Sequence, residues 1–228
     1  MKNPWQRLAS KNVRIQHTKN EVLLPVQTKL LKHYTKPGKA FDDGCGWGEF
    51  ADYLTRLGYT VTAHDPAPAM VKEARTRFQR PTFLTSSELR KRERVLTGQF
   101  DLVSSNLVLC ILSEPEQRRV LCRLKRLLKP DGILLISFCH PCFDTDRSGL
   151  VSTRKTPKHT RYDQTFVYEK RIRENGMVFP DIHRPLTHFF RLFTNANLVI
   201  IDGAESLTTG SSYHPDFITL VLKKRDTN

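Results

Sequence analysis

Hydrophobic positions in the first part of the chain alternate between the spacing of helices and the spacing of buried strands. An apolar stripe at helical spacing predicts a helix that ends near His33, and its members are Val22, Val26, Leu30 and Leu31. A short strand over 39–42 and a glycine-rich loop follow. The segment 47–58 then predicts a helix that ends at Gly58, with Phe50, Leu54 and Leu57 on its inner face.

The same alternation continues to residue 140. Strands are predicted at "YTVTAHD" (59–65), "PTFL" (81–84), "FDLVSSN" (100–106) and "ILLISFCH" (133–140). The segment "PAPAMVKEARTRF" predicts a helix with Pro66 near its start. Ser113, with Glu116 three residues later, predicts a capping box for a helix that runs through Lys129 and buries Val120, Leu121, Leu124, Leu127 and Leu128. Regular alternation of strands and helices indicates a doubly wound, mostly parallel sheet.

The pattern changes after His140. Residues 141–164 are polar and irregular, and "TFVYEKRIRENGMVFPDI" predicts a hairpin with Asn175-Gly176 as its turn. A helix over 185–197 and two strands, 198–205 and 216–224, return the chain to the sheet. We therefore expect a Rossmann-like α/β fold with a seven-stranded sheet, an antiparallel edge hairpin and an inserted lid. The whole chain forms one domain in this interpretation, with an N-terminal helical cap (1–38) and a lid (141–185).

Composition places the chain among folded, globular proteins. It has 228 residues, of which 39% are hydrophobic and 26% charged, and no apolar run approaches the length of a membrane span. No secretory signal opens the sequence, and the five cysteines suit reduced thiols in a cytoplasm better than a disulfide framework. The net charge of +14 has two interpretations. It indicates either a nucleic-acid partner or, the interpretation we favour, charge spread over solvated helix faces such as 89–94 and 118–129.

The loop "DDGCGWG" (42–48) carries the clearest chemical signal. Gly44, Gly46 and Gly48 are spaced G-x-G-x-G, which differs from the G-x-G-x-x-G of dinucleotide folds. Asp42 would repel a phosphate but suits an ammonium group. Asp65, 19 residues after Gly46, ends a strand where an acid accepts the hydroxyls of a ribose. A ligand with a ribose, an ammonium and no phosphate satisfies these features, and S-adenosylmethionine is such a ligand.

Four segments together resemble the class I S-adenosylmethionine-dependent methyltransferases, in particular the small type 11 group. They are "AFDDGCGWGEFADYL", "YTVTAHDPAPAMVKEAR", "FDLVSSNLVLCIL" and "LKRLLKPDGILLIS", and they stand in the family's order and spacing over roughly 39–140. The resemblance implies that Asp42 and the three glycines contact the methionine part, Asp65 the ribose, and "TSSEL" (85–89) the adenine. It implies a cofactor-binding set made of Asp42, Gly44, Cys45, Gly46, Gly48, Asp65, Pro66, Met70, Ser86, Ser87, Asn106 and Trp5. Glu88 is the only acid in the adenine segment, where the family often has one earlier.

Candidate acceptor-side residues follow the fourth and fifth strands. Asn106 ends the fourth strand, where the family places the methyl group, and it is either a positioning residue or an ordinary strand-end residue. The context "SSNL" lacks the Pro-Pro-aromatic signature of nucleic-acid base N-methylation. His140 follows the fifth strand and is either a general base or a packing residue. Cys142 lies after the wrong strand for a cytosine-C5 nucleophile, and the Cys139–Cys142 spacing without further ligands predicts no metal.

The lid supplies the remaining candidates. "DIHRPLTHFF" resembles a family segment near the acceptor pocket, so His183 and Arg184 either contact the substrate or belong to a loop that starts a helix. Arg184 would suit a carboxylate or phosphate. Tyr162, Phe166 and Tyr168 either line an aromatic pocket or pack the hairpin.

Three functions are consistent with these residues. The favoured one is a methyltransferase acting on an O or N atom of a small metabolite, with catalytic candidates His140, Asn106 and His183. The alternative is an RNA-directed methyltransferase, because the lid segments "STRKTPKHTR" and "EKRIR" are basic. A cofactor-binding subunit that activates a partner is the third. We expect a cytoplasmic monomer or homodimer without membrane contact.

Overall fold

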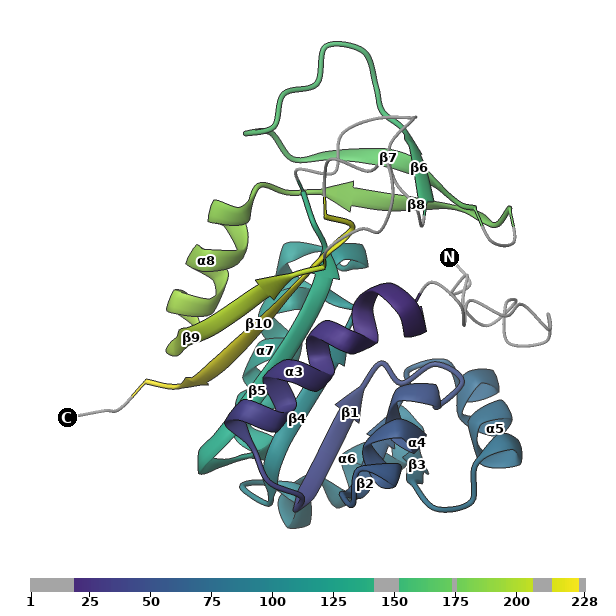
Figure 1. Cartoon of the computed structure of the whole chain (residues 1–228), viewed down its shortest axis with the longest axis vertical. Coiled ribbons are helices and arrows are strands. Elements are labelled where there is room, and N and C mark those ends of the chain that lie inside the picture. Colours follow the sequence, from purple (N-terminus) through teal and green to yellow (C-terminus); the bar gives the residue numbers. More distant parts are fainter. Residues whose placement is uncertain (1–18, 142–151, 174–175, 207–214, 226–228) are drawn as a thin grey trace.

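The computed structural model describes residues 19–141, 152–173, 176–206 and 215–225. Seven strands form one sheet in the order β3-β2-β1-β4-β5-β10-β9 (Figure 1). Their bounds are β1 Lys39–Asp43, β2 Thr60–His64, β3 Thr82–Leu84, β4 Phe100–Asn106, β5 Leu128–Cys139, β9 Leu198–Glu205 and β10 Phe217–Lys224. The pairs β1–β2, β1–β4, β2–β3 and β4–β5 are parallel, whereas β10 is antiparallel to both β5 and β9. The predicted Rossmann-like sheet with an antiparallel edge hairpin is therefore confirmed.

Helices cover both faces of the sheet. Their bounds are α3 Leu24–Tyr34, α4 Glu49–Arg56, α5 Pro68–Arg77, α6 Ser86–Leu96, α7 Glu114–Leu127 and α8 Leu186–Asn195. Side chains of α3, α4 and α5 share one core cluster, and those of α6, α7 and α8 share the other. Strand β5 serves both, because Ile133 and Leu135 point into the first cluster while Leu134 and Ile136 point into the second. This explains its continuous apolar run, which is typical of a strand buried on both faces.

Several element boundaries differ from the sequence prediction. The N-terminal helix begins with a π-helical turn, η1 (Lys19–Leu23), and its buried face is Leu23, Gln27, Leu30 and Leu31, while Val22 and Val26 are half-buried. The capping box of Ser113 and Glu116 is present, but α7 ends at Leu127. The predicted turn over 129–132 instead belongs to β5. In α4, Leu54 is buried as predicted, whereas Phe50 and Leu57 are half-buried.

The described part of the insertion forms a second sheet, in the order β6-β7-β8. Strands β7 (Phe166–Ile172) and β8 (Val178–His183) confirm the predicted hairpin, although Asn175 of its turn lies outside the described residues. Strand β6 (Ser152–Lys155) was not predicted, because its sequence is polar. We call these three strands the lid sheet. It stands beyond the end of β5 and leads into α8 (Figure 1). The domain limits 1–38 and 141–185 stay predictions.

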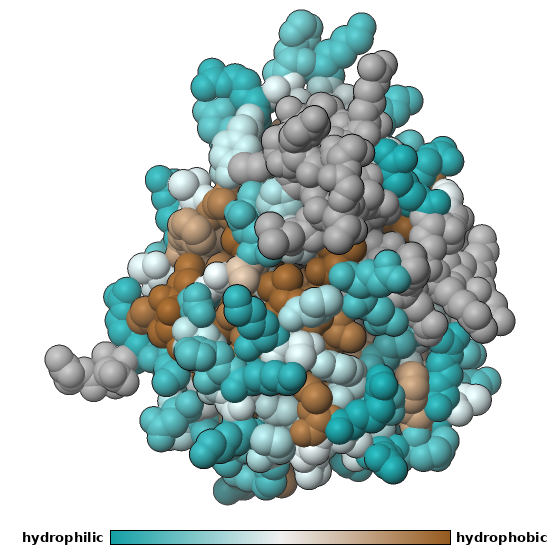
Figure 2. Space-filling view, in the orientation of Figure 1, coloured by the Kyte–Doolittle hydropathy of each residue, from teal (hydrophilic) through white to brown (hydrophobic). Residues whose placement is uncertain are grey.

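The visible surface is mostly polar (Figure 2). Apolar residues gather over the region of β9 and β10 in this view, and the side chains of Val199 and Ile201 on the edge strand β9 are exposed. Within the described residues, no helix has the length and apolar character needed to cross a membrane.

Candidate active site

The glycine loop follows β1 at the centre of the sheet, and two of its glycines are required by packing. Gly44 has φ +74, and a Cβ there would lie 2.3 Å from Cγ2 of Val108. Gly48 has φ +88, and a Cβ there would lie 2.7 Å from Cζ of Phe83. Both residues thus need the left-handed backbone and the absence of a side chain.

Gly46 is different, because a Cβ at this position would meet nothing within 4 Å. The space in front of it is open, and its φ of +56 turns the loop around that space. Its N–H donates to Oδ2 of Asp65 at 2.9 Å, which ties the loop to the end of β2. An open space bordered by backbone and by a carboxylate agrees with the predicted S-adenosylmethionine site, whose residues stay a prediction.

Asp42 is the residue before the last of β1 and Asp65 directly follows β2, its neighbour in the sheet, and both are buried. Asp42 accepts a hydrogen bond from the Ser104 hydroxyl at 2.7 Å, and Asp65 accepts one from the Ala67 N–H at 2.8 Å. Burial raises the pKa of Asp65, and its bonds from the N–H groups of Ala67 and Gly46 lower it in part. A carboxylate has about four lone-pair sites, so the two N–H bonds leave Asp65 able to accept from hydroxyls.

The other predicted cofactor residues lie within this loop and at the start of α5. Burial, followed by the charges of Asp42 and Asp65, raises the pKa of the Cys45 thiol well above its ordinary value, which keeps it neutral. Pro66 is exposed beside Asp65, and Met70 is buried at the start of α5.

The adenine segment forms the first turn of α6. Ser86 Oγ lies 3.1 Å from His64 Nε2, and Ser87 Oγ lies 3.1 Å from the Thr85 hydroxyl. Glu88 caps this helix at Thr85 and accepts from Arg75, so its carboxylate is already engaged. Trp5 lies outside the described residues.

A buried ionic network behind the loop was not predicted. Asp43 accepts from Arg123 Nη2 through both oxygens, at 2.8 Å each, and its Oδ1 lies 2.8 Å from His64 Nδ1. Burial raises the pKa of Asp43, but the hydrogen bond from His64 and the charge of Arg123 outweigh it, so the net pKa is lowered. Because His64 also contacts Ser86, the network joins β1, β2, α6 and α7 behind the site.

Asn106 ends β4, and its amide is fixed by the N-terminal helix. Gln27 Nε2 donates to Asn106 Oδ1 at 2.6 Å and to Ser137 Oγ at 2.9 Å. The Nδ2 group of Asn106 is buried, and no acceptor among the described residues lies within its reach. Gln27 was missed, although its position at helical spacing from Leu23, Leu30 and Leu31 could have marked it as a buried polar residue.

Comparison with known proteins identifies the family of the domain that contains this site. The model of a family described as a methyltransferase domain matches residues 41–136, which include the glycine loop, Asp65 and Asn106. Residues 41–136 are a methyltransferase domain. For this domain the predicted membership of the class I S-adenosylmethionine-dependent methyltransferases is confirmed, and S-adenosylmethionine is its cofactor.

Curated relatives carry the same domain. A ubiquinone biosynthesis O-methyltransferase of Xanthomonas oryzae pv. oryzae is 33% identical over 102 residues, which cover 43% of this chain and 42% of that protein. An uncharacterized methyltransferase of Synechocystis is 27% identical over 143 residues, covering 60% of this chain and 64% of the relative. The chain thus spans less than two thirds of the length of these relatives.

Solved structures share the fold. A 1,6-didemethyltoxoflavin-N1-methyltransferase of Burkholderia thailandensis, solved with 1,6-didemethyltoxoflavin and S-adenosylhomocysteine, has a TM-score of 0.59 at 20% identity and covers 89% of this chain and 77% of its own. An S-adenosylmethionine-dependent methyltransferase of Clostridium acetobutylicum has a TM-score of 0.60 at 15% identity, with coverages of 88% and 89%. At these identities the likeness supports the fold alone.

Just beyond the matched residues 41–136, His140 is buried directly after β5. Its Nε2 lies 2.8 Å from Glu205 Oε1, and because a carboxylate only accepts, Nε2 carries the proton. Its backbone carbonyl accepts from Arg154 Nη2 at 2.9 Å, which connects the lid sheet to the end of β5. Glu205 and Arg154 were not predicted, since nothing in their local sequence distinguishes them.

His183 ends β8, and its ring stacks on Phe166 with 4.5 Å between centroids. Its Nε2 donates to the carbonyl of Tyr162 at 2.8 Å. Burial lowers the pKa of His183, so the ring is neutral at pH 7. Tyr162 is exposed and accepts from the Leu186 N–H through its hydroxyl, so it holds the start of α8.

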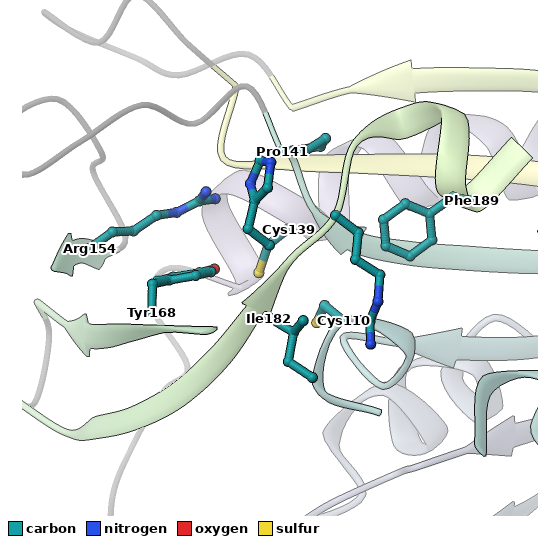
Figure 3. A pocket seen from close by; sticks show the side chains of 9 residues that line it. Cys110, Cys139, Pro141, Arg154, Tyr168, Ile182 and Phe189 are labelled. Carbon is teal, nitrogen blue, oxygen red and sulfur yellow. The ribbon is translucent and has the colours of Figure 1, made fainter. Parts of the chain in front are cut away.

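A small cavity lies between side chains of the lid sheet and those at the ends of β5 and η2 (Leu109–Ile111) (Figure 3). Its volume is about 10 Å³, and its lining is Cys110, Cys139, Pro141, Arg154, Tyr168, Ile182, His183, Arg184 and Phe189. The Arg154 guanidinium lies over the Tyr168 ring, 4.9 Å from its centroid. Tyr168 donates to Asp181 at 2.8 Å, so its hydroxyl is already used within the lid. The structure therefore brings Tyr168, His183 and Arg184 together at one cavity.

Proposed function

We propose that this methyltransferase domain methylates an oxygen or nitrogen atom of a small metabolite that carries an acidic group. S-adenosylmethionine supplies an electrophilic methyl group when it is bound. The chain's own residues must then hold the acceptor, exclude water and remove a proton where the acceptor retains one. The O-methyltransferase among the curated relatives supports the reaction class.

The environment of Arg184 is the main support for an acidic group on the acceptor. Its side chain is 5% exposed, and its Nη2 donates to the carbonyl of Leu112 at 2.6 Å. Its Nη1 is buried and reaches no acceptor among the described residues. A buried guanidinium without an anion is costly, and a carboxylate or phosphate on the acceptor would satisfy it. Arg154 lines the same cavity and adds a second positive charge.

His140 is the proposed general base. With its Nε2 proton donated to Glu205, the ring in its neutral form would carry its lone pair on Nδ1. The Glu205 carboxylate would also stabilise the ring after it has accepted a proton. His183, neutral and held by Tyr162, is a second candidate to contact the acceptor. Asn106, held by Gln27, would position the reacting groups at the end of β4.

Entry of the acceptor requires the lid to move. The cavity of about 10 Å³ has room for about one water molecule, so a metabolite enters only when the lid sheet separates from β5 and the following loop. The bond from Arg154 to the His140 carbonyl would then break. A closed lid keeps water away from the reacting atoms, in line with the role we assign to it.

The test uses S-adenosylmethionine labelled in its methyl group, incubated with the protein and a cell extract that is afterwards separated into small-molecule, RNA and protein fractions. We expect label in acidic small molecules, no label with Asp65→Ala, and at least a tenfold loss with Arg184→Ala. Arg191→Ala changes an exposed arginine of α8 and serves as the matched control. Label in RNA would overturn the proposal. Label in neutral or cationic metabolites would overturn the claim that the acceptor carries an acidic group.

A further inference from the structure

Two buried thiols lie together between the lid sheet and the methyltransferase domain. Cys139 is the last residue of β5, and Cys110 lies in η2 (Leu109–Ile111), the short helix that follows β4. Their sulfur atoms are within 4.8 Å of each other, and the Cys110 thiol donates to the Leu107 carbonyl at 3.4 Å. Both side chains are reduced and buried. Neither thiol has a role in the proposed methyl transfer.

Lys170 of β7 places a positive charge on this pair. Its ammonium donates to Cys139 Sγ at 2.6 Å, and its side chain is only 7% exposed. Asp181 Oδ2 lies 3.4 Å from the same ammonium and also accepts from the Tyr168 hydroxyl. A buried ammonium needs nearby negative charge, and a thiolate on Cys139 supplies it at the shorter distance.

The electrostatic environment distinguishes the two sulfurs. The neighbouring Cys110 thiol and the charge of Lys170 lower the pKa of Cys139 to about 6, against the effect of burial. The neighbouring Cys139 sulfur and burial raise the pKa of Cys110 well above its ordinary value. At neutral pH one sulfur is therefore a thiolate, which is the nucleophilic form, and its neighbour is a thiol.

We propose that Cys139 and Cys110 are a dithiol that a small hydroperoxide converts into an intrachain disulfide. The Cys139 thiolate attacks one peroxide oxygen, the O–O bond breaks, and the leaving oxygen takes a proton from solvent, which gives a sulfenic acid and water or an alcohol. The sulfur of Cys110 then attacks the Cys139 sulfur, forms the S–S bond and releases water, which carries away the thiol proton. Two thiols are oxidised and one hydroperoxide is reduced.

The cavity restricts which reagent can react. Both sulfurs line it, and its volume of about 10 Å³ admits a molecule close to the size of water. Hydrogen peroxide is slightly larger than water, whereas aromatic disulfide reagents are far larger. Cys122 on α7 is exposed and provides the opposite case within the same chain. While the lid is closed, size therefore selects for hydrogen peroxide at the buried pair.

A metal ion is the competing occupant. Cys110, Cys139 and Asp181 together offer three ligand atoms within 4.8 Å of one another. The Lys170 ammonium, 2.6 Å from Cys139 Sγ, already provides positive charge at that sulfur and would repel a cation. The sequence-based expectation that the chain holds no metal stays a prediction, and zinc binding is included in the test.

The experiment follows the thiols directly. The full chain carries Cys142→Ser, so that the tryptic peptide 127–147 contains Cys139 as its one thiol. The reduced protein is exposed to hydrogen peroxide at pH 6, alkylated and digested, and its peptides are identified by mass spectrometry. We expect a disulfide between peptides 95–118 and 127–147 while Cys122 is still alkylated. In Cys110→Ala, Cys139 should stop at the sulfenic acid, which dimedone traps.

Lys170→Met should slow the oxidation of Cys139 by about tenfold or more at pH 6. In the wild type, the larger thiolate fraction at Cys139 outweighs the lower nucleophilicity of a low-pKa thiol, and the variant loses that fraction. Lys158→Met, an exposed lid lysine, should leave the rate unchanged. Cys139 reacting no faster than Cys122 would overturn the inference, as would stoichiometric zinc bound by the reduced protein and lost in Cys110→Ala. These readouts need neither cofactor nor acceptor, so the proposed methyl transfer and the dithiol succeed or fail separately.

Discussion

The buried network of Asp43, His64 and Arg123 makes a prediction that can be worked through in numbers. Asp43→Asn keeps the shape of the side chain but removes the charge that Arg123 and His64 face. Breaking a buried pair by removing one partner costs about 3–5 kcal/mol. Because the Arg123 side chain is 26% exposed and can regain water, we expect the lower end, about 3 kcal/mol. For a chain of this size that corresponds to a fall in Tm of roughly 6–12 °C.

The assay is urea unfolding followed by far-UV circular dichroism at pH 7, with m-values compared to check that the transition stays two-state. Arg123→Met and the double variant complete a mutant cycle, in which we expect a coupling of about 2 kcal/mol or more. Arg119→Met, an exposed arginine one turn earlier on α7, is the matched control and should cost less than about 0.5 kcal/mol.

The pH dependence adds a second check with a definite sign. Since the folded-state pKa of Asp43 is lowered, its contribution to stability is present above the ordinary pKa of aspartate. It is lost as the pH falls through the lower folded-state value. The difference between the wild type and Asp43→Asn should therefore shrink below about pH 4. A cost under about 1 kcal/mol at pH 7, or additive effects in the cycle, would refute the assignment of this network as a stabilising pair.

The remaining predictions concern the site itself. Gly46→Ala should cost about 1–2 kcal/mol in stability through its positive φ, yet raise the Kd for S-adenosylmethionine at least tenfold in calorimetry, because its Cβ enters the cofactor space. Gly44→Ala should mainly destabilise, by about 1–3 kcal/mol in urea unfolding, and equal effects of both variants on cofactor affinity would contradict this division. Gln27→Ala should cost about 2–3 kcal/mol and lower turnover, while unchanged turnover would separate Asn106 from catalysis. Since burial lowers the pKa of His183, its contribution to kcat/KM for the acceptor should be lost only below about pH 6.5, and His183→Asn should make the acid fall of kcat/KM shallower without removing the part due to His140.

The sheet and its helices were predictable because their signals are local. Runs such as 133–140, the Ser113 capping box and the hairpin 165–182 each combine periodicity with a defined start or turn. Where the prediction missed, tertiary packing decided. The N-terminal helix turns Gln27 rather than Val26 toward the sheet, since it follows the face that meets Asn106 and Ser137.

The place of the glycine loop in the fold was predictable for a related reason, since its glycines directly follow a short strand in the sequence. The ionic partners were not, because Asp43 and Arg123 are 80 residues apart and Lys170 is 31 residues from Cys139. No periodicity connects such residues before the fold brings them together. Whether Asn106, His140, His183 and Arg184 act on an acceptor stays a prediction until the substrate is known.

The position of β10 between β5 and β9 sets an order of events during synthesis. Strand β9 leaves the ribosome before β10. Because β10 lies between β5 and β9, strand β9 cannot join the sheet until β10 has been made. Until residues 217–224 emerge, the edge of β5 is unpaired. Strand β9, which follows α8, also has no strand to pair with. An open, apolar edge invites pairing with another nascent chain. The parallel part of the sheet, β1 to β5, can thus assemble early. A chain stalled before β10 would present the unpaired edge of β5 as a template for aggregation.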